Sequence, residues 1–148
     1  MKELVREGNT GRIIVARLND KAELIEEIKR ICKEKGVTSG YVNLIGGIEE
    51  AELISMNKTR PELENKKINH KGPFEVQGIG TIATRENEIV PHIHITLGKY
   101  GNESLTGHLV SGKITMFIEL VIQEIEGIHM IRKEDPENHN LALLNFGD

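Results

Sequence analysis

Two kinds of hydrophobic periodicity divide the first part of the chain. Residues 11–18, GRIIVARL, are rich in β-branched side chains and predict a strand. Residues 19–36 carry apolar side chains at helical spacing and predict an amphipathic helix. Asp20 followed by Glu23 is a capping-box pattern, and Gly36 is suited to end the helix. The apolar stripe of this helix is formed by Leu24, Ile25, Ile28, Ile31 and Cys32.

Beyond residue 38 most apolar residues recur with the period of strands. Residues 39–56 are extended in pattern, and Gly46 with Gly47 favours a bend or bulge. Residues 57–73 are polar, contain two prolines and predict a loop or a frayed hairpin. Further strands are predicted at 74–84, 88–97, 105–127 (with a break near residues 111 and 112) and 141–146.

Two of these strands carry packing predictions. Gly78 and Gly80 lie on one face, so another backbone or side chain is expected to approach closely there. One apolar face of the strand at 105–127 is expected to contain Ile114, Met116, Ile118, Leu120 and Ile122. Mostly antiparallel sheet with one main helix predicts an α+β fold. Without repeats or linkers, residues 1–148 are expected to form a single domain.

Composition narrows the function classes. The chain is 38% hydrophobic and 28% charged, which is ordinary for a globular protein. A net charge of -4 gives no bulk attraction for nucleic acid. Cys32 is the single cysteine, which excludes an internal disulfide and fits a reducing cytoplasm. No signal peptide is apparent and no run is long and apolar enough to span a bilayer, so we expect a cytoplasmic protein with no membrane partner.

The segment PHIHIT, residues 91–96, is the first candidate site. Strand alternation places His92 and His94 on the same face, with Cα atoms roughly 6.6 Å apart. The turn at residues 98–104 would return the chain antiparallel and bring His108 opposite the pair. Three neutral imidazoles leave the fourth position of a tetrahedral ion for water or a ligand. Zinc is the expected ion, with copper, iron and nickel as alternatives.

The alternative is that these three residues are ordinary strand and turn histidines. The third histidine on a hairpin partner favours the metal site over this reading. The other histidines stand alone or in a polar tail, and we expect His70, His129 and His139 to be surface residues.

The motifs GPFEVQGIGTIA (72–83) and PHIHITLGKYGNESLTGHLVSGKITMFIELVI (91–122) resemble the plant-and-prokaryote-conserved (PPC) domain family. Thr106 departs from the family's Gly-Gly-His-Leu turn. The resemblance implies a homotrimer and a metal site at His92, His94 and His108. It also implies an association with DNA, because the plant members carry AT-hook motifs. The fold is similar to that of acetolactate decarboxylase, in which three histidines hold zinc.

Two functions follow from the resemblance. The first is a DNA-binding or regulatory module with a zinc site. The chain has no AT-hook core. Its basic segment is interpreted as a solvated loop, which contains Lys58, Arg60, Lys66, Lys67 and Lys71. The alternative is a zinc-dependent enzyme of unknown substrate, for which Glu75 and Glu119 are the candidate proton-transfer groups.

Overall fold

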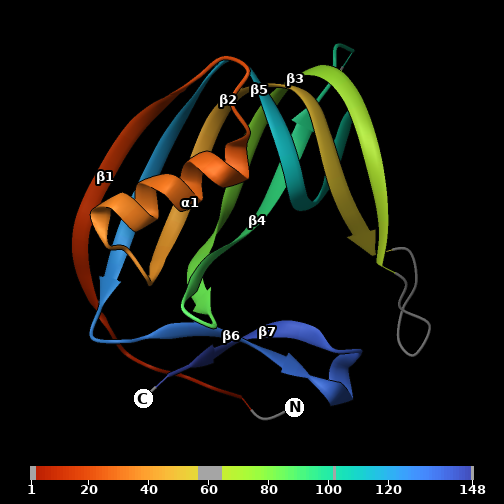
Figure 1. The fold of residues 1–148 in the computed structure, drawn as a ribbon. Coiled ribbons are helices and arrows are strands. Elements are labelled where there is room, and N and C mark those ends of the chain that lie inside the picture. Colours follow the sequence, from red (N-terminus) through yellow and green to blue (C-terminus); the bar gives the residue numbers. More distant parts are fainter. Residues whose placement is uncertain (1–2, 57–64, 102, 148) are drawn as a thin grey trace.

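The computed structural model describes residues 3–56, 65–101 and 103–147 (Figure 1). This part contains a seven-stranded sheet, one α-helix and a short 3₁₀ helix. In chain order the elements are β1 (Asn9–Asn19), α1 (Leu24–Lys35), β2 (Gly40–Met56), β3 (Asn65–Arg85), β4 (Glu88–Gly98), β5 (Ser104–Glu126), β6 (Met130–Asp135), η1 (Pro136–Asn138) and β7 (Leu141–Phe146).

The predicted α+β class is wrong, because about 70% of the described residues lie in strands and about 11% in helices. β2 pairs with β3, β3 with β4, β4 with the start of β5, and β5 returns to β2. These four strands therefore close into a small barrel, and β1 extends the sheet beside β5. The described single chain gives no support to the homotrimer that was expected with the fold.

The helix α1 lies across the sheet and buries the predicted stripe (Figure 1). Gly36 adopts a left-handed conformation, φ 69°, and ends the helix as expected. The N-cap is Glu23 rather than Asp20, and its carboxylate accepts hydrogen bonds from the backbone N–H of Glu26 and of Gly112 in β5, each at 2.7 Å. The cap therefore also fixes the helix to the barrel. Cys32 is fully buried, and burial raises the pKa of its thiol to about 11.

β5 is one continuous strand whose register breaks keep its apolar residues inside the barrel. One break lies between Leu109 and Ser111, near the predicted position. A second lies opposite Gly46, where Met116 adopts a φ of 63° and is 73% exposed. Met116 therefore does not share the buried face, which contains Ile114, Ile118, Leu120 and Ile122.

The polar segment at 57–73 was predicted as a loop or a frayed hairpin, and from Asn65 onwards it agrees with the hairpin. β3 begins at Asn65 and pairs with the end of β2 over residues 65–71. Lys58 and Arg60 lie outside the described residues, whereas Lys66, Lys67 and Lys71 belong to β3. The cross-strand partners supply backbone hydrogen bonds that the local sequence does not reveal.

Gly78 and Gly80 allow the close packing that was predicted for β3. A Cβ at Gly78 would meet the Leu44 side chain at 3.0 Å, and one at Gly80 would meet the backbone of Ile93 at 2.8 Å. The barrel interior is then filled by aliphatic side chains from every strand of the ring and from α1. None of the helices described is long and apolar enough to cross a membrane.

Candidate metal centre

The period-two alternation of β4 separates its histidines from its isoleucines. Ile93 and Ile95 are buried in the barrel core, so His92 and His94 project from the opposite face of the strand. On β3 their cross-strand partners are Thr81 for His92 and Ile79 for His94. The burial of the isoleucines thus fixes where the imidazoles point.

The return of the chain after β4 brings the third histidine to the pair, as the sequence predicted. His108 of β5 is the direct cross-strand partner of His94. It follows Gly107, where a Cβ would lie 2.9 Å from the carbonyl oxygen of Ile54 in β2. The missing side chain at Gly107 therefore lets β5 run close between β4 and β2.

The three rings form one cluster. Their centroids are 4.9 Å apart for His92 and His108, 5.1 Å for His92 and His94, and 5.9 Å for His94 and His108. One ligand nitrogen from each ring lies within 4.8 Å of the others. Nitrogens around a tetrahedral zinc are about 3.3 Å apart, so modest side-chain rotations suffice to close the site. The donor set contains no thiolate or carboxylate, and it suits zinc or another imidazole-binding ion.

The electrostatic surroundings keep these ligands uncharged. Burial, helped by the positive charge of Arg132, lowers the pKa of His92 to about 4. Burial is also the main cause that lowers the pKa of His108. Electrostatic interactions with His94 and with Arg132 lower it further. A metal ion needs the neutral imidazole, so these environments hold two of the three side chains in the form that coordinates.

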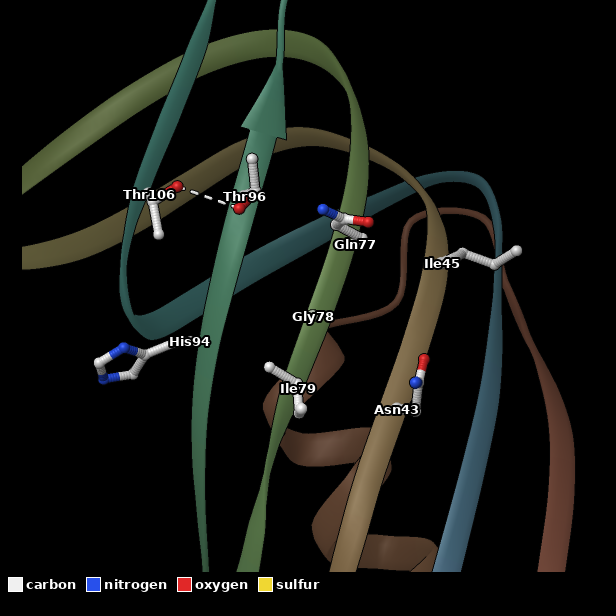
Figure 2. A pocket seen from close by; sticks show the side chains of 8 residues that line it. All are labelled: Asn43, Ile45, Gln77, Gly78, Ile79, His94, Thr96 and Thr106. Atoms are coloured by element: carbon white, nitrogen blue, oxygen red, sulfur yellow. Dashed lines mark hydrogen bonds between the residues drawn. The ribbon is translucent and has the colours of Figure 1, made fainter.

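Two hollows adjoin the cluster. The first, of about 360 Å³, lies over the outer face of the barrel, with His94 at one edge, and Thr96 and Thr106 hydrogen bonded at 3.0 Å within it (Figure 2). Its lining contains no acidic or basic side chain: it is formed by Asn43, Ile45, Gln77, Gly78, Ile79, His94, Thr96 and Thr106. The second, of about 700 Å³, lies between α1 and β4 and reaches His108. One hollow therefore reaches the cluster at His94 and the other at His108.

The two glutamates proposed for proton transfer do not lie at the histidine cluster. Glu75 is exposed and pairs with Gly98, four residues and about 13 Å along β4 from His94. Glu119 is exposed and pairs with Arg17 and Ile45. β2 and β3 lie between this part of β5 and β4 in the order of the sheet.

Arg132 is the nearby residue that the sequence did not single out. It lies on β6, is 9% exposed, and donates a hydrogen bond from Nη2 to Thr81 Oγ1 at 2.7 Å. Thr81 is the cross-strand partner of His92. The sequence signal is an arginine that follows two apolar residues in a short strand, MIRKED, which is too common a pattern to identify a site.

The remaining histidines lie elsewhere. His129 and His139 are exposed, as predicted, and His129 Nε2 lies 3.0 Å from Thr84 Oγ1. His70 is partly buried in β3 opposite Ala51. Within the described residues, His92, His94 and His108 are the one set of three potential metal ligands whose ligand atoms lie close enough together to hold an ion.

Solved structures similar to this chain span nearly all of it. A plant- and prokaryote-conserved (PPC) protein of Pyrococcus horikoshii is 27% identical, with a TM-score of 0.85 and 99% of each chain covered. A metal-containing protein of Archaeoglobus fulgidus is 25% identical, with a TM-score of 0.86, 97% of this chain and 99% of that chain covered. A Staphylococcus aureus protein described as similar to alpha-acetolactate decarboxylase is 10% identical, with a TM-score of 0.53, covering 80% of this chain and 53% of its own.

The last of these likenesses concerns the fold alone. No curated protein sequence matches the chain. A family model, in contrast, matches residues 5–126, which include the histidine strand, the following turn and all of β5. This match confirms the family that the two sequence motifs resemble: the chain belongs to the Plants and Prokaryotes Conserved (PCC) domain family.

Proposed function

We propose that the protein binds one divalent transition-metal ion, zinc, through His92, His94 and His108, and keeps one coordination position open for a small ligand. The observation that carries this proposal is the convergence of three imidazoles on neighbouring strands, with a nitrogen from each within 4.8 Å of the others. The metal-containing protein of Archaeoglobus fulgidus, 25% identical over nearly the whole chain, supports it.

The surroundings favour an ion with an accessible position over a closed structural ion. Three ligands leave one tetrahedral position, and the hollow beside His94 gives a small molecule access to it. A zinc ion in such a site polarises a carbonyl or lowers the pKa of bound water to about 7. The chain's own contribution is to hold three imidazoles together on the barrel, with burial lowering the pKa of His92 and of His108.

Replacement of one ligand tests the proposal. His94→Ala removes one of three ligands, while the buried layer at Ile93 and Ile95 on the other face is untouched. We expect the purified variant to contain far less metal than the wild type, with an unchanged far-ultraviolet circular dichroism spectrum. His139→Ala, an exposed histidine outside the cluster, is the matched control and should keep the wild-type metal content. Equal metal content in both variants would contradict the site.

A zinc-dependent enzyme is the extension of this proposal that the fold likeness to the decarboxylase-related protein suggests. Proton transfer would then depend on groups other than Glu75 and Glu119, because both are exposed and away from the cluster.

DNA binding is the second candidate, and the names of similar structures are what favour it. Proteins of Bacteroides thetaiotaomicron and Ralstonia eutropha, 24% and 17% identical, are named candidate DNA-binding proteins. The net charge of -4 opposes it. We expect a fluorescent duplex at physiological salt to bind weakly and without sequence preference. Sub-micromolar affinity that depends on sequence would favour the DNA-binding function instead.

A further inference from the structure

Arg132 is a buried cation whose usual compensation is missing. Buried arginines are almost always paired with a carboxylate, because an isolated charge loses its hydration. The Arg132 side chain is 9% exposed, and its one hydrogen bond within the described residues goes to the neutral hydroxyl of Thr81. The N–H at Nε is buried and has no acceptor among these residues. A buried donor of this kind indicates an absent acceptor.

The unpaired guanidinium lies beside the histidine cluster. Its partner Thr81 is directly opposite His92 across the β3–β4 ladder. The hydrogen bond of Arg132 Nη2 to Thr81 Oγ1, 2.7 Å, therefore places the guanidinium at the His92 side of the cluster. The candidate metal site and the free N–H group therefore belong to one region of the barrel surface.

The charges in this region do not balance. A divalent ion held by three neutral imidazoles keeps its full charge of about +2, and Arg132 adds one more. The hollow beside His94 offers no carboxylate in return. The hollow beside His108 is lined by Glu26 and Glu88 but also by three basic residues, Lys29, Arg30 and Lys33. Neither hollow has an excess of acidic side chains to offset this positive charge.

We infer that the site binds a small organic carboxylate, whose negative charge is shared by the bound ion and the Arg132 guanidinium. This inference rests on the proposed metal site. A guanidinium and a carboxylate form strong charge-assisted hydrogen bonds, which would satisfy the buried Nε–H. Ile45 and Ile79 line the hollow at His94 and offer an apolar surface to the carbon skeleton of an acid coordinated to the ion, a contact that an inorganic oxyanion does not make.

The probe is acetate, titrated into the cobalt(II)-loaded protein at constant ionic strength and followed by the visible spectrum of the ion. We expect a saturable spectral change in the wild type. Arg132→Gln should weaken acetate binding by about tenfold or more, because it removes a charge-assisted hydrogen bond. Arg85→Gln is the matched control: Arg85 is an exposed arginine of β3 that pairs with Glu134, and its loss should leave acetate affinity unchanged.

The variants are first checked for fold by circular dichroism and for metal content by elemental analysis. If Arg132→Gln does not fold, Thr81→Val takes its place, since it removes the acceptor that positions the guanidinium and should also weaken acetate binding. A wild type without metal defeats the proposed function itself. Full metal content with equal acetate affinity in wild type, Arg132→Gln and Arg85→Gln overturns the inference and leaves the metal site standing. Binding of inorganic phosphate but not acetate also overturns the inference. So does the absence of a spectral change on acetate addition because a carboxylate of a second copy occupies the site.

Discussion

His94 of β4 and His108 of β5 face each other directly across an antiparallel ladder. This ladder is short: it joins residues 94–98 to residues 104–108, whereas the neighbouring β3–β4 ladder runs from Glu75 to Arg85. The two histidines form its last pair, at the seam that closes the barrel. An ion held by both would therefore join the two strands where few backbone hydrogen bonds do so.

The first prediction is that zinc stabilises the folded chain. A ligand that binds only the native state adds about 4 kcal/mol to the free energy of unfolding at 1,000 times its dissociation constant. We expect the thermal midpoint of the chelator-treated protein to rise on zinc addition. His108→Ala should abolish this rise, and His139→Ala should retain it. An equal rise in both variants would show that zinc stabilises the chain by another route.

The second prediction concerns acid and the metal-free protein. The pKa of His92 is about 4 in the folded chain, against about 6.5 unfolded, so the unfolded state binds the extra proton in between. The part of the free energy of unfolding that depends on neutral His92 should therefore be fully present above pH ~6.5. It should be lost as the pH falls towards ~4. The His92 contribution is at most about 3 kcal/mol, and less in practice because the ring is partly solvated.

Urea unfolding at several pH values in the presence of a chelator measures this dependence. Carboxylates also titrate in this range, so the informative quantity is the difference between the wild type and His92→Gln. The variant should lose less stability between pH 6.5 and 4. Parallel curves for the two proteins would refute the assigned role of His92.

The third prediction is that Gly80→Ala disrupts the strand that carries His92. The added Cβ would meet the carbonyl oxygen of His92 and lie 2.8 Å from Ile93 Cα, and neither backbone atom can move without shifting β4. We expect a loss of about 1–3 kcal/mol in the free energy of unfolding, with weaker zinc binding. Gly11→Ala is the control, because its Cβ would meet only the flexible side chains of Glu124 and Glu126. Similar stability of both variants would contradict the close packing of β3 and β4.

The fourth prediction is that Glu75 and Glu119 take no part in metal or acetate binding. Glu75→Gln and Glu119→Gln should each retain one metal ion per chain and the wild-type acetate affinity, because both side chains are exposed and their cross-strand partners lie outside the cluster. Elemental analysis and the cobalt spectrum measure both properties. A change in either property would reassign that carboxylate to the site.

The candidate ligands were predictable from sequence because they depend on local rules. Strand parity determines that His92 and His94 share a face, and the short turn after Gly98 determines that β5 returns beside β4. The stripe and the Gly36 end of α1 follow from helical spacing in the same way.

The features that sequence missed depend on partners far along the chain. The exposure of Met116 follows from a register break against Gly46 of β2, which no local pattern contains. Arg132 reaches the site only because β6 lies beside β3, where Thr84 pairs with Ile131. The strand at residues 65–71 follows from pairing with β2, which the polar composition of that segment opposes.

The metal content of the native protein tests whether His92, His94 and His108 form a metal centre. The chain is purified without chelator or added metal, analysed for transition metals, then stripped and titrated with zinc. We expect one equivalent of transition metal per chain, or uptake of one equivalent of zinc in the titration. Protein that contains no transition metal and takes up no zinc would contradict the metal centre and leave three ordinary strand histidines.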